Sequence, residues 1–181
     1  MTCDHVMLDL ETVDTVATAG IVSIGAFVFY GPSAGKKLYV PVQYQDCLRA
    51  GMSSSVATMD WWGGQPEEVK KALYDPGALP LSTALEVFTQ FARQLCAPRM
   101  WGNGADFDNA ILQYGYRLCR WAPPWKFYHN RCYRTVSVLA PLAREQQGVY
   151  HNALDDAVSQ ASHLLRLMRF PQLKGVLDND I

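Results

Sequence analysis

Three stretches of nearly unbroken apolar character dominate the first part of the chain. They cover residues 5–11, 21–30 and 37–42 and are rich in Val, Ile, Phe and Tyr, which is typical of strands. The first stretch contains V-M-L-D-L, apolar on both faces, so we expect it at the centre of a sheet covered on both sides. The turn-forming G-P-S-A-G at 31–35 separates the second stretch from the third and predicts an antiparallel meander.

Helical spacing replaces strand spacing in the rest of the chain. It is clearest over 82–95, where Leu85, Phe88 and Phe91 fall on one face of a helix. Residues 51–64 are expected to be irregular. Short strands are expected at 99–102 and 125–129, further helices at 45–50, 66–74, 107–120, 135–146 and 152–168, and a tail at 171–181.

Three meandering strands followed by strand–helix units predict an α/β fold. The expected architecture is a mixed five-stranded sheet, antiparallel in its meander and parallel elsewhere, with helices on its faces. A length of 181 residues favours a single domain, which we place at residues 1–170, with the tail beyond it. A hydrophobic content of 49% with 12% aromatic residues excludes a disordered or collagen-like chain.

Charge and cysteine content narrow the classes of function. The 16 Lys and Arg nearly balance the 17 Asp and Glu, which argues against a wide, sequence-independent DNA clamp. The 5 cysteines show no CxxC or CxxH spacing, so we expect the reduced thiols of a cytoplasmic protein and no zinc finger. Early charges and the lack of an apolar run of about 18 residues predict neither a signal peptide nor a membrane span.

Two acidic residues interrupt the first apolar strand. Asp9 and Glu11 are two positions apart, so their side chains leave the same face of the strand, about 6.6 Å apart along it. Buried charges must be paired or must bind a metal ion. A strand end at which both carboxylates are hydrated is an equally good explanation of this pair alone.

A second acidic motif, G-N-G-A-D-F-D at 102–108, occupies the turn between a short strand and a helix. Asp106 precedes the helix and is expected to cap it. Asp108 lies in the first turn at the edge of the apolar stripe and faces along the sheet, so we assign it to the site. Compensation of the helix dipole would by itself explain an Asp at this position.

The third motif, H-N-A-L-D-D-A at 151–157, opens the last helix. Asp156 flanks the expected buried stripe, whereas Asp155 points to the polar side and is expected to be a solvated surface residue. His151 lies in the loop before the helix, free to move over a site. Taken alone, a polar surface position is the simpler explanation for this histidine.

The four carboxylates of Asp9, Glu11, Asp108 and Asp156 are thus expected to converge. They cannot all stay ionised without counterions, and oxygen ligands suit Mg²⁺ or Mn²⁺. Two ions about 3.5–4 Å apart would clamp the attacking and leaving oxygens of a phosphoryl transfer. His151 could then take the proton from the attacking water.

With these motifs the chain resembles the DEDDh exonucleases, which have an RNase H-like fold. The resemblance covers about residues 4–168 and rests on three motifs in order: D-x-E-T at 9–12, F-D at 107–108 and H-x-A-x-x-D-A at 151–157. D-W-W-x-x-Q at 60–65 and W-G-N-G-A-D-F-D-N-A-I-L at 101–112 are similar to one group within the family. That group contains phage exonuclease A, exonuclease VIII-like proteins and a mycobacterial exoribonuclease.

The resemblance implies a 3′→5′ exonuclease that acts on single-stranded or 3′-overhanging nucleic acid and releases nucleoside 5′-monophosphates. It implies that the four carboxylates hold two Mg²⁺ or Mn²⁺ ions, that His151 is the general base, and that Thr12 seats the terminal nucleotide. The alternative is a catalytically inactive module that binds nucleic-acid ends. Such a module would lack a carboxylate or the histidine, and all five are present.

Further substrate contacts are expected from Trp62, Asn103 and Arg134. In the Trp61–Trp62 pair, one indole would stack on a base and the other would pack in the core, and the sequence leaves open which does which. Both DNA and RNA 3′ ends stay open as partners, because no residue reveals contacts to a 2′-hydroxyl. The resemblance implies an intracellular, bacterial or phage-encoded protein without a membrane partner, and a homodimer is left open.

Overall fold

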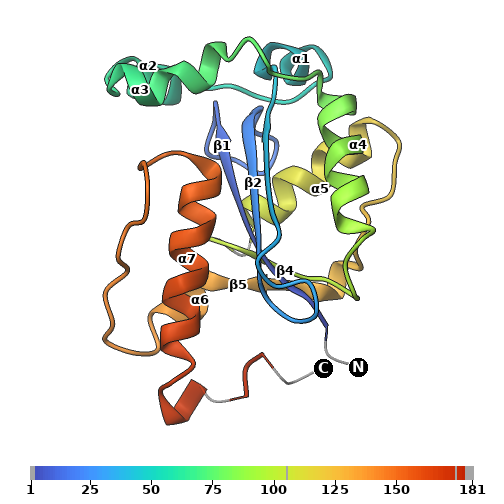
Figure 1. Ribbon diagram of the computed structural model, residues 1–181. Helices are drawn as coiled ribbons and strands as arrows, with labels where there is room; N and C mark the ends of the chain where they lie inside the picture. Colours follow the sequence, from blue (N-terminus) through green and yellow to red (C-terminus); the bar gives the residue numbers. More distant parts are fainter. Residues whose placement is uncertain (1–2, 105, 174, 178–181) are drawn as a thin grey trace.

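A five-stranded sheet runs through the middle of the molecule (Figure 1). The computed structural model describes residues 3–104, 106–173 and 175–177. The strands are β1 (His5–Thr12), β2 (Ile21–Tyr30), β3 (Lys37–Pro41), β4 (Arg99–Gly102) and β5 (Asn130–Cys132). Their order is β3-β2-β1-β4-β5; β1, β2 and β3 pair antiparallel, and β4 is parallel to both of its neighbours. The mixed sheet that the sequence predicted is confirmed.

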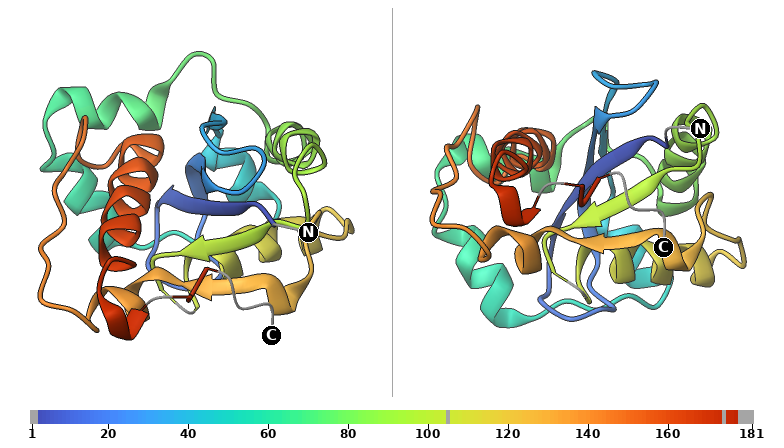
Figure 2. Two further views of the ribbon diagram at one scale, coloured as in Figure 1. Left: turned by 60° about the horizontal axis from the view of Figure 1, so that its bottom comes forward. Right: turned by 90° about the horizontal axis from the view of Figure 1, so that it is seen from below.

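Helices cover both faces of this sheet (Figures 1 and 2). On one face lie α4 (Leu81–Ala92) and α5 (Asp108–Leu118). On the other face lie α6 (Tyr133–Ser137) and α7 (Ala153–Leu167). Each layer packs a hydrophobic core against the sheet, one on each side of the central strand.

The central strand β1 is buried over all 8 of its residues, as its unbroken apolar pattern predicted. Val6 and Leu8 pack into the core formed with α4 and α5. Met7 packs into the core formed with α7. Because side chains alternate along a strand, Asp9 and Glu11 continue the face of Met7 and point toward α7.

The start of α7 lies very close to the sheet. A Cβ atom at Gly25 of β2 would collide with the backbone of Ala153, the first residue of the helix. Gly25 pairs with Asp9 of β1, so the close approach occurs at the level of the first acidic residue. Ala157 and Ala161 continue the small buried face of α7. The glycine therefore lets α7 bring its side chains within reach of β1.

Short helices cover the end of the sheet at which β1 ends (Figure 1). They are α1 (Tyr44–Arg49), α2 (Val56–Gly63), α3 (Glu67–Lys70) and a 3-10 helix (Lys71–Tyr74). The prediction that 51–64 would be irregular was wrong, because α2 begins after its N-cap Ser55. Trp62 is the one buried residue of α2, so no apolar stripe could reveal the helix.

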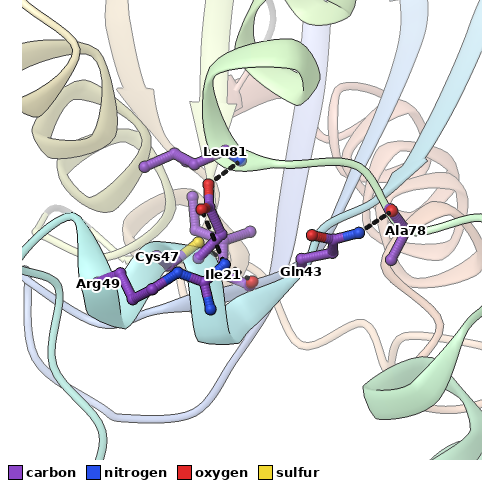
Figure 3. A network of polar contacts seen from close by, with 7 residues as sticks. Ile21, Gln43, Cys47, Arg49, Ala78 and Leu81 are labelled. Carbon is purple, nitrogen blue, oxygen red and sulfur yellow. Dashed lines mark hydrogen bonds and ion pairs between the residues drawn. The ribbon is translucent and has the colours of Figure 1, made fainter.

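A polar network joins α1 to β2 and α4 (Figure 3). The Asp46 carboxylate accepts hydrogen bonds from the backbone N–H of Leu81 at 2.9 Å and from Arg49 at 3.1 Å. The buried thiol of Cys47 donates to the carbonyl of Ile21 at 3.6 Å. All five cysteines are free thiols, as expected. The network fixes the connection that leads from the meander to the helical layer.

The strand expected at 125–129 was placed too early. Trp125 is buried, and its indole N–H donates to the side chain of Asn130 at 2.8 Å. Phe127 and Tyr128 lie exposed in a 3-10 turn, and only the residues after this turn pair with β4. Phe127 and Tyr128 resembled part of a strand in the sequence, although their side chains lie on the surface.

The helix expected at 135–146 was also wrong. α6 ends at Ser137, and an irregular loop leads from there to α7. Pro141 lies within this loop, where it cannot donate the hydrogen bond that a helix needs. The loop is held along α7 instead, with the backbone N–H of Gln147 donating to Ser159 Oγ at 2.8 Å.

The beginning of the expected tail contacts the core. Residues Pro171–Leu173 form a 3-10 turn, and Leu173 is buried against Leu167 and Ala140. Residues 178–181 of the expected tail lie outside the described residues. Within the part of the chain that is described, no helix has the length and apolar character to cross a membrane.

Candidate active site

The acidic pair on β1 is buried. Asp9 and Glu11 each expose 8% of their surface, which does not fit a hydrated strand end. The Oδ1 atom of Asp9 accepts a 2.6 Å hydrogen bond from the Nε2 of Gln160 on α7. The contact confirms that this face of β1 meets α7.

Asp108, the first residue of α5, is only 1% exposed. Its Oδ1 accepts a 3.0 Å hydrogen bond from the backbone N–H of Leu10, and its Oδ2 accepts a 2.6 Å bond from that of Asn103. The first bond ties α5 to β1 midway between Asp9 and Glu11. The second fixes the turn that leads from β4 into the helix.

Asp106 does not occupy the N-cap position expected for it. The N-cap of α5 is Phe107, and Asp106 is exposed in the preceding turn. The buried face of α5 also differs from the predicted one, because it includes Asp108, Leu112 and Gly115. Asp108 therefore lies within the buried face of α5, whereas the sequence placed it at the edge.

Asp156 holds the loop that precedes α7. Its Oδ2 accepts a hydrogen bond from the backbone N–H of His151 and its Oδ1 one from the Nε2 of Gln146, both at 2.9 Å. Candidate ligand atoms of Glu11, His151 and Asp156 lie within 4.8 Å of one another. The His151 ring packs edge-on against Trp61, with centroids 4.8 Å apart. The loop thus brings the histidine to the carboxylates.

Asp155 is not the solvated surface residue that the sequence predicted. It is half-buried, and its Oδ2 accepts a 2.9 Å hydrogen bond from the backbone N–H of Val149. It also lies against Gly148, whose φ of 73° favours glycine. Asp155 therefore anchors the loop that carries His151.

Burial raises the pKa values of Asp9, Glu11 and Asp108, and for Asp9 and Glu11 the charges of neighbouring carboxylates add to this effect. Burial, followed by the charges of Asp108 and Glu11, holds the pKa of Asp9 well above its usual value. Burial and then the charge of Asp156 raise the pKa of Glu11 to about 8. Burial raises the pKa of Asp108 to about 6, against the opposing effect of the backbone N–H groups that it accepts from. The negative charges of Asp9 and Glu11 are therefore not fully compensated by their surroundings.

The cavity between these groups measures about 270 Å³. It is lined by Asp9, Leu10, Glu11, Asn103, Arg144, Tyr150, His151, Asp156 and Gln160. Several carboxylates beside one imidazole make a donor set that suits Mg²⁺ or Mn²⁺. Cations would also relieve the repulsion that raises the pKa values. The residues present therefore fit divalent metal ions.

The expected substrate-binding residues Thr12 and Trp62 have different environments. Thr12 lines a second cavity of about 440 Å³, which also reaches Glu11. Trp62 is fully buried and donates to the carbonyl of Thr12 at 2.9 Å, so it belongs to the core and cannot stack on a base. Trp61 is 41% exposed and lines the second cavity. Of the two indoles, Trp61 is the one that faces the site.

Asn103 and Arg134, the other two expected substrate contacts, both lie near Asp108. Asn103 lines the carboxylate cavity and donates its backbone N–H to Asp108. Arg134 is exposed on α6, and its charge lowers the pKa of Asp108. Both side chains are thus placed where a substrate strand could meet them.

Three residues at the site, Gln146, Gln160 and Arg144, were missed from the sequence. Gln160 follows Asp156 by four residues on α7, a spacing that places two side chains on one helix face and could have revealed it. Gln146 and Arg144 belong to the loop that was expected to be helical. The side-chain carbonyl oxygens of Gln146 and Gln160 are buried and accept no hydrogen bond from any described residue, which leaves both available to a cation or a water molecule.

We expect the metal-free protein to lose stability as the pH rises from about 4.5 to about 8. The pKa of Glu11 is raised from 4.5 to about 8, so its contribution to stability is full below 4.5 and is lost as the pH passes through about 8. Asp108 also contributes stability at low pH, and this contribution is lost as the pH rises through about 6. Melting temperatures in chelator across this range test the prediction.

Two comparisons sharpen this test of the pH dependence. Glu11→Gln should flatten the curve, since the amide does not titrate. Mg²⁺ or Mn²⁺ should raise the melting temperature most at the alkaline end. A wild-type curve that stays flat or rises between these pH values would contradict the electrostatic description of the site.

A family of known proteins matches almost the whole chain. The sequence model of the Rv2179c-like 3′-5′ exoribonuclease domain matches residues 4–168. No curated protein sequence matches the chain closely enough to count as a relative. The assignment of the protein to a family therefore rests on the match to the family model and on the fold.

Solved structures of 3′ exonucleases share the fold. The nuclease domain of 3′hExo, a DEDDh family member bound to rAMP, aligns with a TM-score of 0.55 at 14% identity, covering 93% of this chain and 92% of that one. A full-length 3′-exonuclease aligns with a TM-score of 0.57 at 12% sequence identity. A 3′-exonuclease recognising the histone mRNA stem-loop aligns with a TM-score of 0.58 at 13% sequence identity. Each alignment covers 93% of this chain and 82% of the other.

These structures confirm the RNase H-like sheet flanked by helices. The order of the acidic motifs, the convergence of their side chains and the matched family all agree. The chain belongs to the Rv2179c-like 3′-5′ exoribonuclease domain family and is a 3′-5′ exonuclease.

Proposed function

We propose that the protein removes nucleotides one at a time from the 3′ end of single-stranded or overhanging RNA and releases nucleoside 5′-monophosphates. The observation that carries this proposal is the meeting of three carboxylates and His151 around one cavity, with Asp108 directly beside it. RNA is favoured over DNA because the matched family is described as exoribonucleases. One of the similar structures is bound to rAMP, and another is described as recognising a histone mRNA stem-loop.

In this proposal Asp9, Glu11, Asp108 and Asp156 hold two Mg²⁺ or Mn²⁺ ions. Such ions would neutralise the scissile phosphate and lower the pKa of the attacking water. His151 accepts the proton of that water on its imidazole nitrogen. Asp156 supports this role from the backbone side, because its bond to the His151 N–H orients the residue toward Glu11.

The remaining residues of the two cavities would bind the substrate. Arg144 lines the carboxylate cavity and can neutralise a non-bridging phosphate oxygen. Thr12 and Trp61 line the second cavity, which begins at Glu11 and has room for the terminal nucleotide. The closer kinship with phage exonuclease A and exonuclease VIII-like proteins remains a proposal that rests on the sequence motifs.

A degradation assay with matched RNA and DNA tests the proposed reaction. With 5′-labelled oligonucleotides, we expect a ladder that shortens from the 3′ end, faster for RNA, in Mg²⁺ or Mn²⁺. Chelation should abolish the reaction, because the carboxylates repel one another without cations. A 3′-phosphorylated strand serves as the control for end specificity. Degradation that proceeds fully in chelator would contradict the metal-dependent mechanism, and faster loss of DNA would contradict the assignment to RNA.

Trp61→Ala is expected to raise KM about 5- to 150-fold, because stacking on one base contributes about 1–3 kcal/mol. Trp61→Phe should retain most of the affinity, since it keeps an aromatic face. Steady-state kinetics on a short oligoribonucleotide measure both variants, and the melting temperature controls for folding. If Trp61→Ala leaves KM unchanged, the exposed indole does not contact the substrate.

A further inference from the structure

We propose that a surface patch at the C-terminal end of α5 is a second binding site for single-stranded nucleic acid. The patch comprises Arg93, Arg117, Arg120, Trp121, Lys126, Phe127 and Tyr128, and we call it the Trp121 patch. It rests on the proposed function, because it would hold the 5′-lying part of a strand whose 3′ end occupies the carboxylate site. In Figure 1 the loop after α5 lies beside α4, on the side of the sheet away from α7.

Large aromatic side chains are exposed in this patch. Trp121 exposes 44% of its surface, Phe127 77% and Tyr128 55%. The rings of Phe127 and Tyr128 meet edge to face, with centroids 5.3 Å apart. Exposed aromatic faces offer stacking platforms for bases of any sequence, provided that the strand is not paired. The aromatic part of the patch therefore favours a single strand.

Positive charge surrounds the exposed indole. Trp121 forms a wall of two hollows, of about 560 and 460 Å³. The basic residues that line them are Arg93, Arg120, Arg117 and Lys126. Glu86 is the one carboxylate among the lining residues. All four basic side chains are exposed, and none forms an ion pair with another described residue. Their charges are thus available to a polyanion.

The backbone presents Trp121 in a fixed position. α5 ends with the backbone N–H of Trp121 donating to the carbonyl of Tyr116 at 2.9 Å and that of Arg120 donating to Arg117 at 3.0 Å. These two bonds form a Schellman motif, in which Arg120 occupies the left-handed position with a φ of 59°. Because the backbone that carries Trp121 is already ordered, binding at this position costs little backbone conformational entropy.

The charge distribution favours nucleic acid over a second copy of the chain. A symmetric dimer would place the same patch on both sides of the interface, so the four cations would face four cations. A nucleic-acid strand instead alternates phosphates with bases, which matches cations interleaved with aromatic rings. α5 has 11 residues, from Asp108 to Leu118, so the patch lies about 15 Å from the carboxylate site along the helix. A single strand of several nucleotides is long enough to reach both sites, whereas a dinucleotide is not.

Binding and turnover of RNAs of different length test this inference. In chelator, where the strand is not degraded, Trp121→Ala should weaken binding of a 15-nucleotide RNA at least about fivefold, measured by fluorescence anisotropy. Trp121→Tyr should restore most of the affinity. In Mg²⁺, kcat/KM for a dinucleotide should equal the wild-type value, because a dinucleotide does not reach the patch. A wild-type protein that fails to cleave the dinucleotide would count against the proposed function and leave the binding result standing.

Salt dependence tests the cations separately. Arg117→Ser/Lys126→Ser should reduce the slope of log affinity against log salt by about 1.4, or about 0.7 for each phosphate that the protein no longer neutralises. The matched control, Lys36→Ser/Arg169→Ser, removes the same charge from exposed positions elsewhere and should leave the slope unchanged. Equal effects of the two pairs would overturn the inference. The inference would also be overturned if Trp121→Ala bound the 15-nucleotide RNA as tightly as wild type, or if its kcat/KM fell equally on the dinucleotide. A change in oligomeric state without a change in RNA binding would overturn it as well.

Discussion

Asp9→Asn is expected to lower kcat at least about a hundredfold and, at the same time, to raise the melting temperature of the metal-free protein. Activity falls because a neutral amide is a poor replacement for a carboxylate that binds cations. Stability rises because burial and the charges of Asp108 and Glu11 oppose the ionised form of Asp9. The amide oxygen can still accept the hydrogen bond from Gln160.

Asp108 and Asp156 do not offer such a clean substitution. Asp108 accepts backbone hydrogen bonds on both of its oxygens, and Asp156 also uses both. An amide at either position would turn its NH₂ group toward another donor, so lost activity there would be mixed with lost structure. Charge can therefore be removed at Asp9 with less disturbance than at Asp108 or Asp156.

Single-turnover kinetics and thermal melting in chelator measure the two effects of Asp9→Asn. Asp106→Asn is the matched control, since Asp106 is exposed and lies outside the cavity; it should change neither quantity appreciably. A variant that keeps near-normal turnover would remove Asp9 from the metal site. A variant that melts earlier than wild type in chelator would show that the buried charge is better compensated than its raised pKa indicates.

His151→Asn is expected to lower kcat by about 10²–10⁴-fold, the usual contribution of a general base. Asn is the better substitution because the φ of His151 is 61°, a left-handed conformation that Asn tolerates and most other side chains do not. The backbone N–H, which donates to Asp156, is retained. The carboxylates should therefore stay in place while the imidazole is lost.

Metal binding separates the role of His151 in chemistry from a role in structure. Titration with Mn²⁺, followed by the rise in melting temperature, should give a similar affinity in His151→Asn and in wild type if the histidine acts mainly on the water. Turnover that stays near the wild-type rate would show that another group activates the water. A large loss of Mn²⁺ affinity would instead place the imidazole among the metal ligands.

The parts of the fold that the sequence predicted well are those whose pattern reflects burial directly. β2 and β4 begin and end at the residues that the apolar runs marked. The helix expected at 135–146 failed because Pro141 and contacts along α7 hold that segment as a loop. α2 was missed because a helix with one buried residue carries no periodic signal.

The site residues that the sequence revealed are likewise those whose burial is evident from the local pattern. Asp9 and Glu11 could be recognised because charges within a buried strand need a reason. Trp62 could not be told from Trp61, because adjacent identical residues differ only in the direction of their side chains on α2. The two glutamines that bind Asp9 and Asp156 depend on long-range contacts, and local composition does not reveal such contacts.

The absence of a side chain at Gly25 determines whether the two parts of the active site can come together. Asp9, Glu11 and Asp108 belong to the sheet and one helical layer, whereas Asp156 and His151 arrive with the other layer, and the two meet where Gly25 admits the backbone of Ala153. A methyl side chain at this position would collide with the backbone of Ala153 and displace the start of α7 from the sheet. This displacement would move Asp156 and His151 away from Asp9 and Glu11, so assembly of the site depends on how closely α7 packs against β2.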